Sequence, residues 1–423
     1  MLSTLRNAWR IPDIRKRMLF TLLMLLIFRL GSSIPVPGIN RAVIKEIFEM
    51  SKGGVLEFLD LMGGGTFSNF SIFALNITPY ITSSIIIQLL TIAIPRLEEL
   101  AKEGEEGRKK ISQMTRYGTV ILALIQAIGI TIGFFNRALI SKGFISVSIV
   151  VITLTAGTAF LMWLGEQITD KGIGNGISLI IFIGIISRIP SEIVNTLALY
   201  KAGTIKLIGI ILFVIFALLI IGIVIALQEG ERKIPVQYAK RVVGRKMYGG
   251  QSTHIPVKVS MAGVIPVIFA SSLLAFPQTI ALFAKGEPSQ WITKYLTPSG
   301  SVGIWIYSIL NILLIIFFTY FYTAIQFNTV EYAKNLQQYG GFIPGIRPGK
   351  PTTEYLNKVI SRITFVGAIS LAVIASLPII ISSIFKLNIN FGGTALIIVV
   401  GVALETVKQI EAQMLMRHYK GFL

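Results

Sequence analysis

The chain has 423 residues, of which 53% are hydrophobic and 14% are charged, and its formal net charge is +19. Soluble domains are about 25% charged, so this composition excludes an ordinary soluble enzyme, and the apolar content excludes a disordered chain. The chain has no cysteine, which excludes disulfides, thiolate metal sites and cysteine nucleophiles. We therefore expect a membrane protein. Its two histidines, His254 and His418, are far apart and lie outside an HExxH pattern, so we expect neither a metal nor a cofactor.

Apolar runs alternate with polar breaks along the chain. A hydrocarbon core about 30 Å thick takes about 20 apolar residues per helix, and in lipid a spanning run of this kind must be helical. The pattern predicts ten spans, at 18–34, 73–94, 117–135, 144–165, 176–189, 207–227, 260–284, 302–325, 363–385 and 393–414. The run at 207–227 has no polar side chain and is the clearest span, whereas Arg188 and Glu405 interrupt the fifth and tenth spans early.

Lysine and arginine are distributed unevenly between the two sides that ten spans create. On the side of both termini there are 27 of them, on the other side there are 11, and Arg29 lies inside the first span. Cytoplasmic loops carry the excess of Lys and Arg, so both termini are predicted to be cytoplasmic. The alternation also favours an even number of spans.

Ten spans divide into five and five, and because five is odd, similar halves would have opposite orientations in the membrane. The second span contains ITPYITSS and the seventh contains VIPVIFASS, each with a proline before a Ser-Ser pair. This echo favours an inverted repeat, although apolar helices resemble one another in any protein. The predicted parts are a cytoplasmic segment 1–17, a first half 18–190, a connecting loop 191–206, a second half 207–414 and a cytoplasmic tail 415–423.

Two predicted cytoplasmic loops, 228–258 and 326–360, are long enough to suggest a function. The second ends in the Gly/Pro-rich tip GGFIPGIRPGKPT. Rigid basic tips suit acidic protein surfaces or RNA phosphates, but the positive-inside rule explains the same charges, and both interpretations stay open. The basic residues singled out in these loops are Arg241, Arg245, Lys246 and Arg347.

A few polar features interrupt the apolar pattern. The stretch LMGGGTFSNFSIF at 61–73 is too polar to span, so it predicts either a re-entrant element packed inside the protein or an ordinary surface loop. Arg29 either marks a function or extends its side chain to the membrane interface. Gln88 and Gln126 can form hydrogen bonds between helices.

Motifs for nucleotide binding and nucleophilic catalysis do not occur in the sequence, which has neither GxxxxGK[ST] nor GxSxG. Active transport would therefore take its energy from a partner or from ions. The residues leave open a passive channel, a secondary transporter of small solutes with a five-plus-five inverted repeat, and an intramembrane protease. A transporter would be favoured by carboxylates near the midplane, and a protease by a paired nucleophile and base.

Seven segments, distributed over the whole chain, match in the same order the sequence of a known protein family. They are FRLGSSIPVPGIN at 28–40, SIFALNITPYITSSIIIQLL at 71–90, EGRKKISQMTRYGT at 106–119, FLMWLGEQITDKGIGNGISLIIF at 160–182, QSTHIPVKVSMAGVIPVIFASS at 251–272, GGFIPGIRPGKPT at 340–352 and FGGTALIIVV at 391–400. Together they resemble the SecY family, the channel subunits of the bacterial protein translocase. The resemblance implies an all-α fold in which two inverted five-helix halves form an hourglass channel in the cell membrane. Such a channel passes unfolded preproteins and opens sideways to lipid.

The resemblance also implies site residues and partners. A ring of apolar side chains would consist of Ile77, Ile81, Ile177, Ile181, Ile268 and Ile398. A plug at about 61–72 would include Gly63, Gly64, Gly65, Thr66, Phe67 and Ser68. A lateral gate would include Thr82, Gln88, Gln126, Ser272 and Phe276. The two halves would be hinged at the loop 191–206. The residues that would dock the SecA motor or the ribosome are Arg241, Arg245, Lys246 and Arg347. SecE and SecG would be small subunits, and signal peptides would enter the gate.

Overall fold

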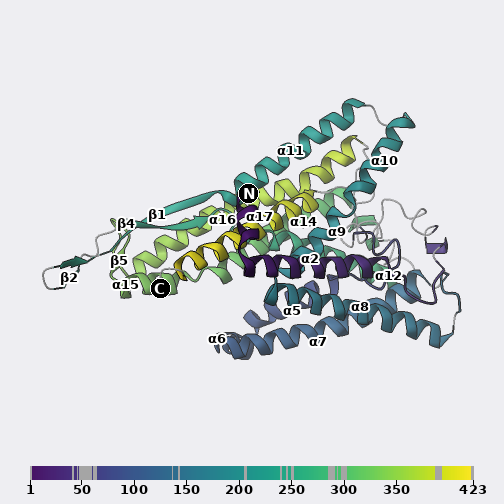
Figure 1. Cartoon of the computed structure of the whole chain (residues 1–423), viewed down its shortest axis with the longest axis horizontal. Coiled ribbons are helices and arrows are strands. Elements are labelled where there is room, and N and C mark those ends of the chain that lie inside the picture. Colours follow the sequence, from purple (N-terminus) through teal and green to yellow (C-terminus); the bar gives the residue numbers. More distant parts are fainter. Residues whose placement is uncertain are drawn as a thin grey trace.

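The computed structural model is built almost entirely from helices (Figure 1). It describes residues 2–40, 42–44, 46, 60, 64–135, 137–141, 143–203, 207–238, 241–243, 246–248, 252–283, 291–292, 294–296, 303–385 and 393–420. The helices are α1 (Leu2–Arg10), α2 (Pro12–Ser33), α5 (Thr78–Ala93), α6 (Pro95–Lys102), α7 (Glu105–Gly129), the π-helix η1 (Ile130–Phe134), α8 (Phe144–Lys171), α9 (Gly176–Ile186), α10 (Ile189–Lys201), α11 (Leu207–Glu229), α12 (Ile265–Phe283), α14 (Gly303–Gln326), α15 (Thr329–Gln338), α16 (Lys350–Phe385) and α17 (Gly393–Lys420). The strands are β1 (Glu231–Tyr238), β2 (Arg241–Val243), β3 (Lys246–Tyr248), β4 (Ser252–Lys258) and β5 (Gly341–Phe342).

Every predicted span overlaps a helix of the structure, in chain order α2, α5, α7, α8, α9, α11, α12, α14, α16 and α17. In the described part of the chain, six helices are long and apolar enough to cross a membrane. A seventh counts if α5 and α6, which meet at 101°, form one span. Pro95 begins α6 and causes this bend, because proline cannot continue the hydrogen-bond ladder of α5. The chain is therefore a multi-pass membrane protein, while the number ten remains a prediction.

Three segments expected to be loops contain regular secondary structure. The expected hinge loop 191–206 is largely the helix α10, which has a proline in its first turn and Glu192 and Lys201 at the ends that the helix dipole favours. The loop 228–258 contains strands β1 to β4, and the loop 326–360 contains α15 and the start of α16. The tenth predicted span, 393–414, lies inside α17, and this helix continues through Glu405 to Lys420.

The helices form two groups that meet along two seams. In the first group α2, α5, α7, α8 and α9 pack together, and in the second α11, α12, α14, α16 and α17 pack together. Along the first seam α12 lies against α5, α7 and η1, and along the second α17 lies against α2 and α9. Figure 1 shows α2 and α17 between the outer helices of the two groups. A site that opens between the groups would therefore be lined by α5, α9, α12 and α17.

Strands from both long loops form one protrusion at the end of the helical body (Figure 1). β1 pairs with β4 along its length, and β5 joins the other edge of β1 through Gln237↔Phe342 and Tyr238↔Gly341. Ile234, Val236 and Leu356 are buried here and join this sheet to α16 in one apolar cluster. The two predicted loops are therefore a single folded unit.

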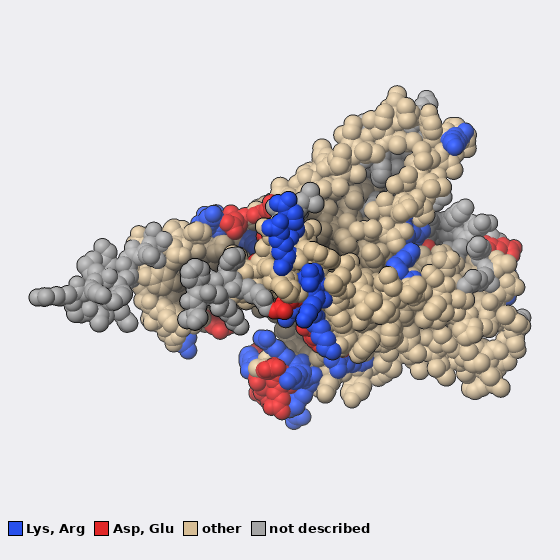
Figure 2. All heavy atoms as spheres, in the orientation of Figure 1, with Lys and Arg blue, Asp and Glu red and all other residues tan. Residues whose placement is uncertain are grey.

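Charge is concentrated at the same end of the molecule. On the face drawn in Figure 2, Lys, Arg, Asp and Glu gather toward the end that carries α1, α6 and the strands. The helical body beyond them shows few charged side chains on this face. Apolar side chains point outward from this body, as the exposed Leu218 and Leu219 of α11 illustrate, which suits contact with lipid.

Candidate pore and gate

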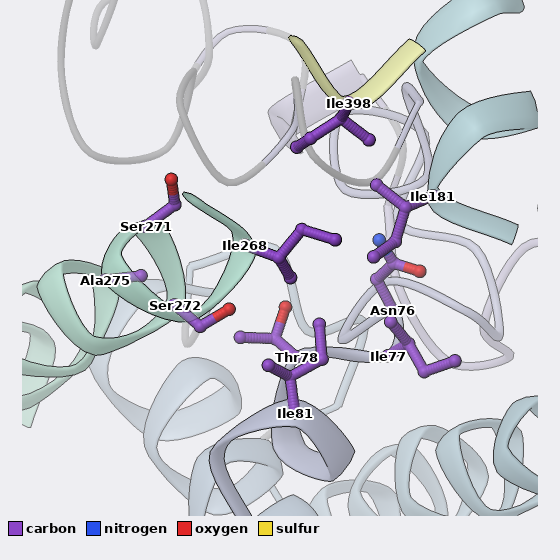
Figure 3. A pocket seen from close by; sticks show the side chains of 10 residues that line it. All are labelled: Asn76, Ile77, Thr78, Ile81, Ile181, Ile268, Ser271, Ser272, Ala275 and Ile398. Atoms are coloured by element: carbon purple, nitrogen blue, oxygen red, sulfur yellow. The ribbon is translucent and has the colours of Figure 1, made fainter. Parts of the chain in front are cut away.

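A small cavity lies where the two groups of helices meet (Figure 3). Ile77 and Ile81 approach it from the start of α5, Ile181 from α9, Ile268 from α12 and Ile398 from α17. In Figure 3 these side chains point toward one another from different helices, with Ile268 between the others. Five of the six residues expected to form the ring are therefore brought together, although the sequence separates them by more than 300 positions.

The cavity is too small to be an open passage. It encloses about 20 Å³, room for roughly one water molecule. Its other lining residues are Asn76, Thr78, Ser271, Ser272 and Ala275. Apolar constrictions block ions by excluding the water that must accompany them. The arrangement is thus a closed constriction between the two groups of helices.

Ile177 is placed differently from the other expected ring residues. Although it lies one turn before Ile181 on α9, the described residues that line the cavity do not include it. At Gly165 of α8, an added Cβ would lie 3.1 Å from the Cγ1 of Ile177, so this side chain packs on α8. Gly176 explains the difference, because a Cβ there would lie 1.9 Å from the Gly165 carbonyl, so the helices can approach very closely.

The glycine-rich segment before α5 is packed inside the protein. Thr66, Phe67 and Phe70 are each at most 2% exposed, so the surface-loop interpretation is wrong for the described residues 64–72. Gly64 has φ +66, and a Cβ on it would lie 2.5 Å from the Gly184 carbonyl of α9. The segment therefore contacts α9 about one turn beyond Ile181. Gly63, also expected in the plug, lies outside the described residues.

Asn76 joins this segment to the constriction. Its φ of +51 is in the left-handed region, which asparagine tolerates better than most residues. The next residue, Ile77, is the N-cap of α5, and both residues line the cavity. One turn of backbone thus connects the buried segment 64–72 to the ring.

The seam between α5, α7 and α12 carries the residues expected in the lateral gate. Thr82, Gln126 and Ser272 are buried there, and Phe276 is half-buried. The Oγ1 of Thr82 donates to the Thr78 carbonyl of its own helix at 3.0 Å. These side chains come from all three helices of the seam.

A hydrogen bond crosses between the two groups near this seam. The hydroxyl of Tyr322 on α14 donates to the Oε1 of Gln88 on α5 at 2.7 Å. The Nε2 of Gln88 donates to the Ser84 hydroxyl at 3.3 Å, which orients the amide. Gln88 therefore links helices from both groups, which agrees with the expectation that it forms a hydrogen bond between helices. Nothing in the sequence pointed to Tyr322, since a tyrosine in an apolar helix is ordinary.

The expected docking residues lie on or near the protrusion. Arg347 is exposed in the turn that follows β5, and its carbonyl accepts a hydrogen bond from the Thr352 hydroxyl at 2.9 Å. Arg241 begins β2 and Lys246 begins β3, two short strands that pair with each other. Arg245 lies outside the described residues. In the described part of the chain, no three His, Cys, Asp or Glu side chains gather where they could hold a metal ion.

Comparison with known proteins identifies the family. The family model SecY matches residues 71–407. The chain belongs to the SecY family. Protein translocase subunit SecY of Halalkalibacterium halodurans is 50% identical over 436 residues, which covers 100% of both chains.

Two solved structures share the SecY fold. One is described as "The plug domain of the SecY protein stablizes the closed state of the translocation channel and maintains a membrane seal" and has a TM-score of 0.68, 20% identity and coverage of 95% of this chain and 93% of that chain. The other is described as "Sec61 in the Canine ribosome-channel complex from the endoplasmic reticulum" and has a TM-score of 0.63, 18% identity and the same coverage, 95% and 93%. At these identities the two likenesses establish the fold.

Proposed function

We propose that this chain is the channel subunit of a bacterial protein translocase, which passes unfolded secretory polypeptides across the cell membrane. The observation that carries the proposal is the constriction of isoleucines from four helices at the junction of the two groups, in a chain of the SecY family. Isoleucine side chains are stiff and form no hydrogen bonds, so the ring fits around any passing sequence without binding it. Ile177 would join the ring only if α9 shifted away from α8.

The seam at α5, α7 and α12 would serve as the exit to lipid. A segment of about 10 Leu-like residues gains roughly 3–6 kcal/mol on entering the membrane, at about 0.3–0.6 kcal/mol each. One charge at the centre costs about 2.5–3.5 kcal/mol. An open seam can therefore distinguish membrane segments and signal peptides from secreted sequence, with the Gln88–Tyr322 hydrogen bond among the contacts that must break.

Partners would supply the energy and complete the assembly. A SecA-type ATPase motor or a ribosome would dock on the protrusion that presents Arg347, and SecE and SecG would be the small subunits. The relative described with a ribosome supports this kind of docking surface. Both termini would lie in the cytoplasm, according to the distribution of Lys and Arg. Neither the described residues nor the comparisons favour the alternative of a small-solute transporter.

Reconstitution tests the proposal. Liposomes would contain the full chain with SecE- and SecG-type subunits, a SecA-type motor and an unfolded precursor with a signal peptide. We expect part of the precursor to become protected from added protease only when ATP is present. A precursor without its signal peptide is the control and should stay accessible. Failure to protect with partners that support transport by a SecY relative would overturn the proposal.

A further inference from the structure

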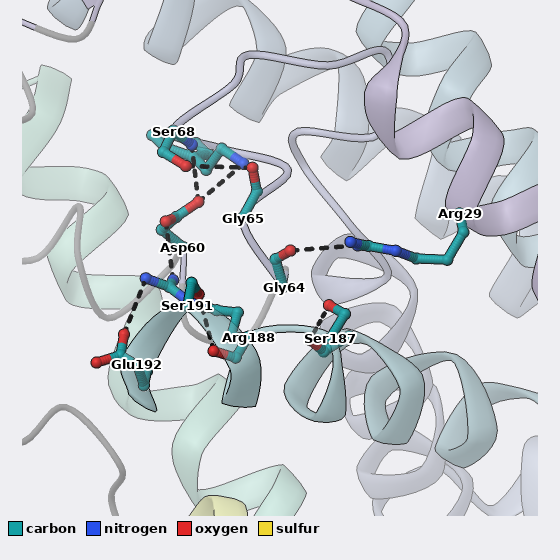
Figure 4. Close-up of polar contacts among 11 residues, drawn as sticks. Arg29, Asp60, Gly64, Gly65, Ser68, Ser187, Arg188, Ser191 and Glu192 are labelled. Carbon is teal, nitrogen blue, oxygen red and sulfur yellow. Dashed lines mark hydrogen bonds and ion pairs between the residues drawn. The ribbon is translucent and has the colours of Figure 1, made fainter. Parts of the chain in front are cut away.

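One carboxylate organises the buried segment 64–72. The Oδ1 of Asp60 accepts hydrogen bonds from the backbone N–H of Ser68 at 2.7 Å and of Phe67 at 3.1 Å. The carbonyl of Asp60 accepts a third from the N–H of Gly65 at 3.1 Å. Asp60 thus closes the turn of the segment around its own side chain and backbone (Figure 4).

The other oxygen of this carboxylate faces an arginine from a distant part of the chain. The Oδ2 of Asp60 lies 2.8 Å from the Nη1 of Arg188, and the two side chains are 4% and 18% exposed. Glu192 lies 3.7 Å from the second guanidinium nitrogen of Arg188. Removing one partner of such a buried pair leaves an uncompensated buried charge, which strongly destabilises the arrangement that buries it.

Arg188 lies next to a helix that contacts the second group of helices. It stands between the end of α9 and the start of α10, and its carbonyl accepts a hydrogen bond from the Ser191 hydroxyl at 2.8 Å. α9 also contacts α17, a helix of the second group. A shift between the groups at this seam would therefore move the guanidinium relative to Asp60.

The rest of the described segment is held without a buried charge pair. The N–H of Val36 donates to the Phe70 carbonyl at 3.0 Å, and the N–H of Ile72 donates to the Ile34 carbonyl at 2.9 Å. The Nη1 of Arg29 on α2 donates to the Gly64 carbonyl at 3.5 Å (Figure 4). Close packing of Gly64 on Gly184 adds contact area but no charge pairing. The ion pair of Asp60 with Arg188 combines burial and charge with two backbone hydrogen bonds to the described segment.

We infer that Asp60 and Arg188 form a latch that holds the segment 64–72 in its buried position, and that breaking their ion pair releases the segment. This inference deepens the proposed function, because it rests on the segment acting as the plug of a protein channel. Arg188 acts through Asp60, so it is a positioning residue for the plug. Opening of the seam between α9 and α17 would weaken the latch and so couple movement of the two groups to release of the plug.

The absence of native cysteine makes a direct test possible. A single reporter, Ser68→Cys, is introduced into the full chain in membranes, and its alkylation by an impermeant maleimide is timed without substrate or motor. We expect Arg188→Gln to speed alkylation by about tenfold or more, since Asp60 keeps a buried, unpaired charge. The alkylation rate of Arg188→Lys should stay near that of the parent, because lysine keeps the positive charge beside Asp60.

A double-mutant cycle separates the ion pair from general damage. Asp60→Asn keeps an oxygen for the two backbone N–H groups but removes the charge, so the double variant Asp60→Asn, Arg188→Gln should react more slowly than Arg188→Gln alone. Glu98→Gln is the matched control, because it breaks an exposed ion pair with Lys102 and should leave the rate unchanged. Thermal unfolding in detergent should be similar for all variants that are compared.

Two outcomes would overturn the latch. The first is an alkylation rate for Arg188→Gln equal to that of the parent. The second is a rate increase in the double variant equal to the product of the two single increases, because independent effects mean that the two residues do not interact. If Arg188→Gln does not accumulate, the alkylation rate of Asp60→Asn is compared with that of Arg188→Lys, because the first variant loses the ion pair and the second keeps it. Equal alkylation rates in these two variants would reject the latch. Because this assay needs no precursor, a failed latch and a failed channel assignment give different results.

Discussion

Isoleucine closes the constriction because its shape and its chemistry both oppose hydration. Two heavy atoms on Cβ leave few side-chain rotamers, so each ring residue holds a defined position when several meet. None of these side chains offers a hydrogen bond to water, and a cavity of about 20 Å³ leaves no room for a hydrated ion. The seal therefore depends on apolar character more than on any one contact.

Replacing Ile268 by asparagine should open this seal. A buried amide without a partner costs about 1–3 kcal/mol, which corresponds to about fivefold to 150-fold in the ratio of open to closed channels. Ion leak through the reconstituted channel should rise accordingly, and precursors with weakened signal peptides should be accepted. Ile268→Val is the control and should leave the leak near the parent value. An unchanged leak in Ile268→Asn would show that this residue does not form the seal.

Helix α5 contacts both the constriction and the seam that is proposed as the lateral gate. Its first turn carries Ile81 at the cavity, and its later turns carry Gln88, which accepts the hydrogen bond of Tyr322 from α14. Ser83 of the same helix donates to the Thr115 carbonyl of α7 at 2.9 Å. α5 is thus bonded to its own group on one face and to the other group on another, so movement at the seam reaches the ring directly.

Tyr322→Phe should favour an open seam without disturbing the packing. It removes one neutral hydrogen bond, worth about 0.5–1.5 kcal/mol, so the open-to-closed ratio should rise about two- to tenfold. Crosslinking of a signal peptide to the seam should increase by a similar factor. Tyr320→Phe on the same helix is the matched control, because Tyr320 bonds to the Ser361 carbonyl within the second group. Equal crosslinking in both variants would assign no gate role to Tyr322.

At the scale of the whole molecule, the face drawn in Figure 2 has its charged side chains toward the end that carries the strands and a largely apolar helical body beyond them. Two loops that are distant in sequence pair through β1 and β5, so the turn that carries Arg347 follows a strand of a folded sheet. A rigid support lets a basic side chain meet an acidic or phosphate-rich surface without first becoming ordered. Folding of the protrusion would therefore set the geometry of the proposed docking surface.

Arg347→Glu should abolish docking while leaving the fold intact. The residue is exposed, and surface substitutions of this kind change stability by about 0.5 kcal/mol or less. We expect motor-driven protease protection to fall at least about tenfold, with a smaller loss at low salt, where attraction by the remaining basic residues is less screened. Lys358→Glu, an equal charge change at an exposed position of α16, should have little effect. Normal transport by Arg347→Glu would remove Arg347 from the docking surface.

Patterns that act locally along the chain were readable from the sequence. Runs of apolar residues about 20 long can only be helices in lipid, so the helices that overlap the predicted spans followed without tertiary information. The counts of Lys and Arg in successive loops predict the sidedness of the chain, which stays a prediction. Glycines indicated an unusual backbone, which Gly64 and Gly65 adopt with positive φ, and Gln88 indicated a bond between helices. The seven collinear segments indicated the family.

Pairings between distant residues were decided only by the tertiary structure. Ile177 and Ile181 share a helix face, yet the close approach of α8 and α9 at Gly165 draws Ile177 away from the cavity. Asp60 and Arg188 are 128 positions apart, and each alone is an unremarkable charge beside an apolar run. Spacing along one helix or loop determines which elements form, but the contact between elements depends on how closely their backbones approach, and that approach is set by side chains from the whole chain.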